Sequence, residues 1–170
     1  MFKVNDTVLY GAHSVCKIAD ITVKELGGES VEYYVLKPIY DTKSTLFVPL
    51  HNEKLTSRMR PVLSPSEVMD LIKSIPKEES LWIDNDKVRK EKYKEIIAEG
   101  DRAQLVGIIK AIYQHQESLK EKGKKLHIAD DNALKDAEKM LYDEFAYVLD
   151  IDREEVLSFI TTKIDSVKGQ

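Results

Sequence analysis

Over the first 50 residues, hydrophobic and polar positions alternate, which predicts β-structure. Apolar side chains recur on even positions in residues 2–10, and β-rich runs follow over residues 15–23 and 31–39. A period of two is that of a half-buried strand. Two consecutive glycines before the third run supply the positive φ angles of a tight hairpin turn. A fourth run over residues 45–48 ends at Pro49. We therefore expect about four or five short strands in a small twisted sheet or an open barrel.

After residue 61 the hydrophobic period becomes that of a helix. Ser64, Pro65 and Glu67 provide an N-cap serine, a proline at the first helical position and a glutamate at the third, which is the capping-box order. Pro76 ends the helix that they open. Apolar stripes and capping residues predict four further helices, which begin near Asn85, Asp101, Asp130 and Asp152.

The two patterns divide the chain into two domains. Strands fill residues 1–61 and helices fill residues 62–170, with a short linker near residues 58–64. Because no strand signal interrupts the helices, the predicted fold class is α+β, with a small β domain followed by an all-α helical bundle.

Charge is distributed unevenly between these parts. The 170 residues contain 26 Lys plus Arg and 30 Asp plus Glu, a net charge of −4, which argues against a surface coated with positive charge for nucleic acid. Residues 84–125 nevertheless hold 11 basic and 8 acidic side chains, and residues 126–170 hold 5 and 11. Opposite signs in adjacent segments indicate either helices that pair or a face kept for an anionic partner.

Composition also bears on the cellular location. The chain has no run of 18 apolar residues, which excludes a membrane-spanning helix. The polarity of the amino terminus alternates and predicts no signal peptide. Cys16 is the single cysteine, so neither an internal disulfide nor a cysteine-based zinc site is possible. Together these features predict a cytoplasmic protein in a reducing compartment.

The sequence gives little support to catalysis. The histidines lack metal-ligand spacing, and each is expected at the surface or in a loop: His13, His51, His115 and His127. Nucleophile-elbow and phosphate-loop motifs are absent. The carboxylates fall at helix starts and on polar faces, although a paired acid and base could be hidden among them. We therefore expect no metal, no cofactor and no enzyme.

The predicted helix after residue 85 is rich in cations. Lys87, Lys90 and Lys94 share one helical stripe, and Arg89 and Lys92 occupy a neighbouring part of the surface. Such a stripe can bind DNA phosphates with a salt-dependent gain from counterion release. The alternative is a solvated helix face, since acidic residues are interspersed.

Trp82 is the only tryptophan, and it stands in a polar segment directly before this helix. An indole beside a cationic helix can stack on or wedge against a distorted base step. Alternatively, Leu81, Trp82 and Ile83 form a hydrophobic staple that pins the entry of the helix onto the bundle. The sequence leaves both interpretations open.

At this point the chain resembles a known family, the CarD/CdnL transcription regulators, whose β domain is shared with the transcription–repair coupling factor. The matching residues of the β half are Phe2-Lys3-Val4, Asp6, Val8 and Tyr10, then Glu32-Tyr33-Tyr34-Val35-Leu36, and Val48-Pro49. In the helical half, the match is Trp82 ahead of a basic, tyrosine-containing helix and Gly100-Asp101 opening the next helix. The order and spacing of these motifs cover essentially the whole chain.

The resemblance implies a Tudor-like or SH3-like barrel that docks on the β subunit of bacterial RNA polymerase by adding a strand. It implies a helical domain that lies over promoter DNA at the upstream edge of the transcription bubble, largely independently of DNA sequence. By position, Trp82 is the minor-groove wedge, and the phosphate contacts are Lys87, Arg89, Lys90 and Lys94. In the β domain, Lys24 and Phe47 take the places of polymerase-facing residues.

The expected function is that of a bacterial transcription regulator, a monomer, that stabilises the open complex. The alternative is a protein–protein adaptor that never touches DNA. This chain is longer than some relatives between Trp82 and Gly100, and Ile83-Asp84-Asn85-Asp86 places acidic groups close to the wedge.

Overall fold

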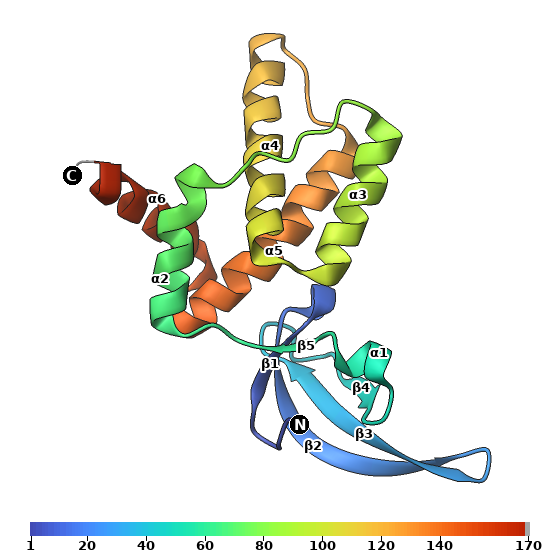
Figure 1. Cartoon of the computed structure of the whole chain (residues 1–170). Helices are drawn as coiled ribbons and strands as arrows, with labels where there is room; N and C mark the ends of the chain where they lie inside the picture. Colours follow the sequence, from blue (N-terminus) through green and yellow to red (C-terminus); the bar gives the residue numbers. More distant parts are fainter. Residues whose placement is uncertain (169–170) are drawn as a thin grey trace. The chain divides into compact units, whose positions relative to one another are not determined.

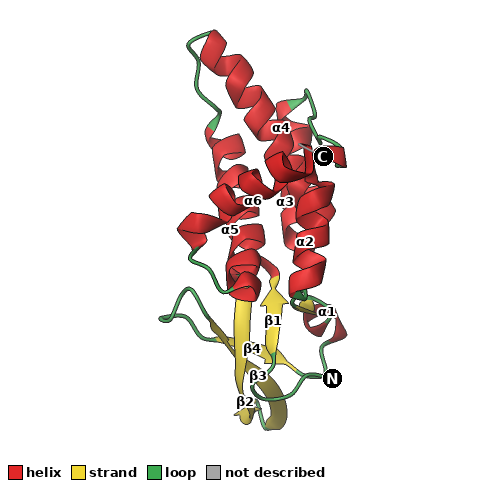
Figure 2. Cartoon of the chain, turned by 90° about the vertical axis from the view of Figure 1, so that its left-hand side faces the viewer, coloured by secondary structure: helices red, strands yellow, loops and turns green. Residues whose placement is uncertain are grey.

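The computed structural model describes residues 1–168, which divide into two compact units, one over Met1–Val62 and one that begins at Leu63. Strands are confined to the first unit, and the second is built from helices (Figures 1 and 2). The predicted α+β class is confirmed.

The first unit is a five-stranded antiparallel sheet in the order β4-β3-β2-β1-β5. Its strands are β1 (Thr7–Tyr10), β2 (Val15–Leu26), β3 (Glu29–Pro38), β4 (Leu46–Pro49) and β5 (Met59–Pro61), with a 3-10 turn, η1 (Gly11–His13), and a short helix, α1 (Glu53–Thr56). One face is closed by a core of Val8, Cys16, Ile18, Tyr34, Leu36, Val48 and Met59. Cys16 is fully buried there, as its apolar strand predicts.

The β2–β3 hairpin is longer than the sequence pattern indicates. Pairing continues to Leu26↔Glu29, and the register shifts once, between Ile18 and Asp20. The two turn glycines have φ angles of 60° and 83°, which residues other than glycine rarely adopt. Beyond the shift the side chains are largely exposed, as Val23 is at 57%. The alternation that marks a half-buried strand is therefore lost in this outer part of β2.

The expected linker near residues 58–64 is partly wrong. Residues 59–61 form β5, which pairs with β1 from Tyr10↔Met59 to Val8↔Pro61. Three residues that end in proline give no strand signal on their own. As an edge strand, β5 tolerates a residue that cannot donate to the ladder.

The five helices predicted after residue 61 are all present. They are α2 (Pro65–Ser74), α3 (Asp86–Glu99), α4 (Arg102–Glu121), α5 (Ile128–Leu149) and α6 (Arg153–Lys168), with a 3-10 turn, η2 (Ile75–Lys77), after α2. The Ser64 capping box is complete, since Ser64 Oγ accepts from Glu67 N and Glu67 Oε2 accepts from Ser64 N. Gly100 ends α3 in the left-handed conformation at φ 72°. Only α5 begins earlier than expected, at Ile128.

Two apolar clusters hold the helices together. One joins α3, α4 and α5 through Tyr93, Ile96, Ile108, Ile112 and Leu134. The other joins α2, α4, α5 and α6 through residues that include Val68, Ile72, Val106, Phe145 and Val156. Since α4 and α5 contribute to both clusters, they form the frame on which α3 and the segment before it are mounted (Figure 1).

Among residues 1–168, no helix is long and apolar enough to cross a membrane. Over the same residues, no group of three or more His, Cys, Asp or Glu side chains is arranged to hold a metal ion.

Candidate functional site

The half-buried Lys110 of α4 fastens η2 and the start of the segment that follows it. Lys110 Nζ donates to the carbonyl oxygens of Ile75 at 3.0 Å, Pro76 at 3.4 Å and Glu78 at 2.6 Å. An ammonium group has three donors, and here they satisfy carbonyls at the end of a helical stretch. The ammonium group of Lys110 therefore stabilises the fold and is not directed at solvent.

A glycine inside α4 lets the same segment approach closely. Leu81 N donates to Gly107 O at 3.1 Å, and a Cβ at position 107 would lie 2.6 Å from Leu81 Cγ and 2.8 Å from Glu79 O. From the other side, the Tyr93 hydroxyl donates to Leu81 O at 2.6 Å. Burial raises the pKa of Tyr93 to about 12, so this donor keeps its proton at neutral pH. The backbone that carries Trp82 is thus fixed from two helices.

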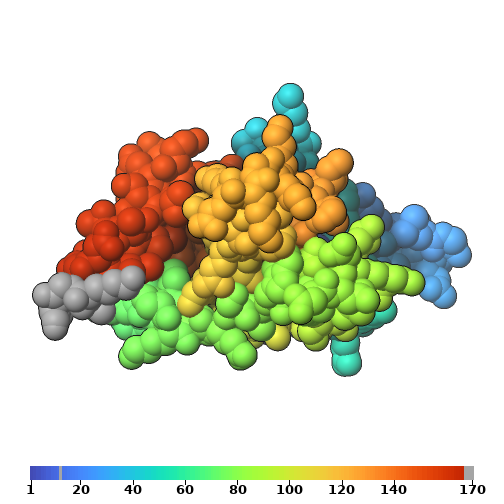
Figure 3. Space-filling model, turned by 90° about the horizontal axis from the view of Figure 1, so that it is seen from above, coloured from blue at the N-terminus to red at the C-terminus, as the bar shows by residue number. Residues whose placement is uncertain are grey.

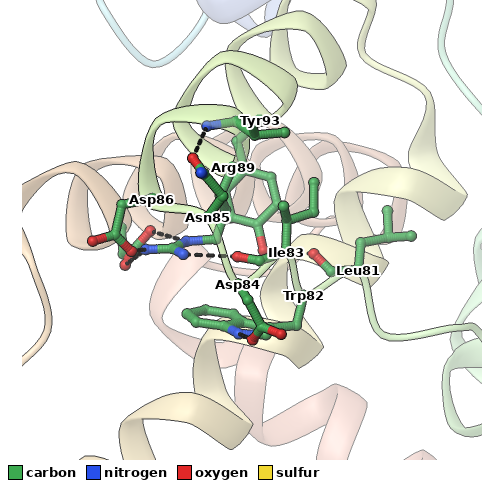
Figure 4. A network of polar contacts seen from close by, with 10 residues as sticks. Leu81, Trp82, Ile83, Asp84, Asn85, Asp86, Arg89 and Tyr93 are labelled. Carbon is green, nitrogen blue, oxygen red and sulfur yellow. Dashed lines mark hydrogen bonds and ion pairs between the residues drawn. The ribbon is translucent and has the colours of Figure 1, made fainter.

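Trp82 is half-buried, and its side chain contacts His115, Arg89 and Asp84; Figure 4 shows it beside the last two. Its ring stacks on the His115 imidazole of α4, with centroids 4.0 Å apart and planes 23° apart. Arg89 Cζ lies 4.2 Å from the ring centroid, within cation–π range. Trp82 Nε1 donates to Asp84 Oδ1 at 3.1 Å. The staple neighbours Leu81 and Ile83 are half-buried as well.

Arg89 does not lie on the outer surface, contrary to the sequence-based expectation. Its side chain is 3% exposed and forms a two-pronged ion pair with Asp130 of α5, with both N–O distances 2.8 Å. It also donates to Ile83 O and to Asp86 Oδ1. Asp130 is the main cause that raises the pKa of Arg89, so the guanidinium is charged throughout the physiological range. With its donors directed at these protein acceptors, Arg89 holds the start of α3 together and is not placed to bind a phosphate.

The remaining lysines of α3 do form an exposed stripe. Lys87, Lys90 and Lys94 are exposed, whereas the packed face of the helix carries Arg89, Tyr93 and Ile96. At 100° per residue, these three lysines lie on the side of α3 that faces away from this packed face. Trp82 packs toward Arg89, so the structure places the indole and the stripe on different sides of the helix.

A second group of lysines lies on the α4–α5 turn. Lys120, Lys122, Lys124 and Lys125 are exposed, and three of them line a shallow hollow of about 340 Å³ together with Gln116, the residue after His115. Figure 3 shows this turn (orange) next to the start of α3 (yellow-green) on one face of the helical unit. Cations therefore lie on the α4 side of Trp82 as well as on α3.

In the first unit, the two expected polymerase-facing residues are in contact. Lys24 Nζ of β2 lies 3.5 Å from the ring centroid of Phe47 on β4. Phe47 is 44% exposed and meets Tyr33 of β3 edge-to-face, with centroids 6.3 Å apart. Because β4 is an edge of the sheet and pairs with β3 alone among the described strands, this aromatic patch borders a free strand edge.

Sequence reasoning missed four residues that build the site, namely Gly107, Lys110, His115 and Asp130. A glycine in the middle of an apolar helical stripe is a signal of close approach, and Gly107 could have been found in this way. The other three contact residues that are distant in the sequence. The separation ranges from 32 residues, for Lys110 and Glu78, to 41 residues, for Arg89 and Asp130. No local pattern specifies such pairs.

Comparison with known protein families gives two matches. The model described as the CarD-like/TRCF RID domain matches residues 2–63, and the model of the CarD C-terminal domain matches residues 67–161. Together they span both units. No curated protein matches the chain significantly.

Proposed function

The chain belongs to the CarD family of RNA-polymerase-interacting transcription regulators, and on this premise we propose that it binds the β subunit of bacterial RNA polymerase and stabilises the promoter open complex by contacts with DNA at the upstream edge of the bubble. The RID domain implies polymerase binding, and CarD proteins are non-enzymatic transcription factors. The β subunit as the target, the DNA contacts and the residues that make them are the parts proposed here.

The β4 edge is the proposed polymerase contact. An exposed strand edge offers unpaired N–H and C=O groups to a partner strand, and side chains beside it supply specificity. Phe47, supported by Lys24 and Tyr33, is a preformed aromatic surface of the kind that dominates protein interfaces. Phe47 can therefore make an apolar contact with a partner, and the ammonium group of Lys24 places a positive charge beside that contact.

The observation that carries the DNA part of the proposal is the mounting of Trp82. It is the single tryptophan, half-buried, on a segment fixed by Lys110, Gly107 and Tyr93. Apolar wedges in the minor groove act on base steps, whereas cations on either side contact the phosphates and set the register. The exposed lysines of the α4–α5 turn are the cations proposed for this role on the α4 side, and those of α3, on the side of that helix away from the indole, extend the cationic surface.

Charge explains why a tether is needed. Residues 64–170 carry a net charge of −5, so the helical unit by itself has weak affinity for DNA. Binding to polymerase converts DNA contact into an intramolecular event at high effective concentration. A protein that contacts the open state better than the closed state shifts the equilibrium by that difference in free energy.

The adaptor function stays a second candidate, and one observation favours it. Trp82 packs on His115 and Arg89 as a hydrophobic staple would, and an indole that never left this environment would serve the fold alone. Removal of Trp82 would then leave the open complex unchanged.

Polymerase docking is tested by Phe47→Glu in the full chain. Because loss of a hot-spot aromatic at an interface costs about 2 kcal/mol or more, we expect binding to the isolated β subunit to weaken by about thirtyfold or more in biolayer interferometry. The control is Lys54→Glu on the exposed side of α1. Equal affinity of wild type and Phe47→Glu would remove this surface from the proposal.

The phosphate contacts are tested by charge reversal at Lys90 and at Lys124 separately. Each variant should weaken DNA binding in the polymerase complex and reduce the slope of log K against log salt by about 1. Lys73→Glu on α2 is the charge-matched control. A slope that stays the same in both variants would mean that these lysines are solvated surface.

A further inference from the structure

We infer that His115 is a positioning residue for Trp82, that is, that its imidazole holds the indole in the orientation used on DNA. This inference rests on the proposed function, because it assigns a role to the stack between His115 and Trp82 in open-complex stabilisation. It concerns a histidine that the sequence marks only as a surface residue.

The contact is between rings, at the distance of a true stack. The centroids are 4.0 Å apart and the planes are inclined by 23°. Aromatic pairs favour centroid separations of about 4.5–7 Å, so this pair is closer than that range. Both rings are half-buried.

Hydrogen bonds tie together the backbone on both sides of the stack. His115 lies on α4, eight residues after Gly107, whose carbonyl accepts from Leu81 N next to Trp82. Ser80 Oγ and Gln114 Oε1 are 3.0 Å apart, a second bond between the same segment and the same helix. With both Cα positions fixed in this way, the imidazole selects the rotamer of the indole.

Two other groups complete the cage around the indole. Asp84 Oδ1 accepts from Nε1, and the Arg89 guanidinium lies over the ring, itself fixed by Asp130 (Figure 4). An indole held from three sides loses little rotamer entropy when it meets DNA, and this preorganisation strengthens binding. Of the three side chains, that of His115 makes no interaction besides the stack among those described for residues 1–168, so it is the residue to substitute.

The first test uses Trp82 as its own reporter, since it is the only tryptophan. In the full chain, His115→Ala should raise the acrylamide quenching constant of Trp82 and lower its fluorescence anisotropy, because the ring is released. His115→Phe keeps a stacking partner and should restore both values to those of wild type. His127→Ala, an exposed histidine with no side-chain capping bond, is the control. Unchanged quenching in His115→Ala would overturn the inference.

The second test measures the lifetime of polymerase–promoter open complexes after addition of competitor, at saturating protein. We expect His115→Ala to shorten the wild-type lifetime by about two- to tenfold, which is the value of one aromatic pair, and His115→Phe to recover it. A lifetime that is equal or longer in His115→Ala, with Trp82 released, would overturn the inference, since the stack would then be neutral or would restrain the indole.

Trp82→Ala distinguishes failure of this inference from failure of the proposed function. If Trp82→Ala shortens the lifetime and His115→Ala does not, the wedge stands and the positioning role is wrong. If Trp82→Ala has no effect, the wedge itself fails, and His115 is then a contact of the fold only.

Discussion

At the scale of single residues, Arg89 shows how a charge pattern can hide a structural ion pair. It stands among four lysines in the sequence of α3. Of these five basic residues, the four lysines are exposed and Arg89 is buried. Arg89 lies between Asp86 one turn before it and Asp130 on α5. Its planar guanidinium matches the carboxylate of Asp130 with two parallel bonds, which the ammonium group of lysine cannot do.

The first prediction concerns this pair. Asp130→Ala leaves a buried guanidinium without its main partner, so we expect the free energy of unfolding to fall by about 3–5 kcal/mol in urea denaturation. Lys90→Ala, on the exposed flank of the same helix, should change it by no more than about 0.5 kcal/mol. Equal midpoints for the two variants would show that the Arg89–Asp130 pair does not hold α3 in solution.

A second prediction follows from Glu138 on α5. Burial raises the pKa of Glu138, with a further contribution from the charge of Asp131, whereas the hydrogen bond from the Tyr113 hydroxyl at 3.0 Å lowers it. Burial also raises the pKa of Tyr113 to about 12, so the phenol remains the donor. Because the pKa of Glu138 in the folded state lies above its ordinary value of 4.5, the folded state binds the proton more tightly, and stability decreases as pH rises through this interval.

Glu138→Gln removes this penalty and keeps an acceptor for Tyr113. The variant should match wild type in urea denaturation below pH 4.5 and become the more stable of the two as pH rises toward 7. Glu117→Gln, on an exposed position of α4, is the matched control variant. A stability difference of Glu138→Gln that is constant with pH would contradict the effect of burial.

At the scale of elements, the sequence predicts what local chemistry determines. The Ser64 capping box, the Asn85 and Asp101 N-caps and the Gly100 terminus all follow from side chains that bond within three residues or from a left-handed φ. Elements such as β5 and the last residues of β2, beyond the predicted run over residues 15–23, form because of partners elsewhere in the sheet, and their own residues do not predict a strand.

In the candidate site too, local features can be predicted from the sequence, whereas contacts between distant residues cannot. Trp82 and the lysine stripe of α3 stand out in the sequence because tryptophan is rare and a helical stripe has a period. The stack of Trp82 on His115 cannot be predicted in this way, because the two residues meet only after the segment before α3 has packed on α4.

The third prediction tests that packing. In an open helix interior, alanine is about 1 kcal/mol more favourable than glycine, but at position 107 its Cβ would lie 2.6 Å from Leu81 Cγ and 2.8 Å from the Glu79 carbonyl oxygen. The carbonyl belongs to the backbone and cannot rotate away, so we expect Gly107→Ala to lower stability by about 1–3 kcal/mol and to raise quenching of Trp82 by acrylamide. A Gly107→Ala protein that is more stable than wild type would show that the segment does not lie close to α4.

At the scale of the whole molecule, the chain joins a unit of the polymerase-interacting type to a helical unit with a net negative charge, which we propose binds DNA weakly until it is tethered. In the proposed function, specificity for promoters comes from polymerase, and the helical unit adds a preference for a distorted base step. The open state is favoured because an intact duplex must first be unstacked before a side chain can enter.

The decisive measurement is the lifetime of open complexes after addition of competitor, with no added protein, with wild type and with Trp82→Ala. Polymerase occupancy should be equal for the two proteins, since Trp82 lies in the helical unit and Phe47 in the other. We predict that wild type prolongs the lifetime and that Trp82→Ala loses most of this effect. Equal lifetimes for wild type and Trp82→Ala, at equal occupancy, would contradict the account and favour an adaptor that does not use its tryptophan on DNA.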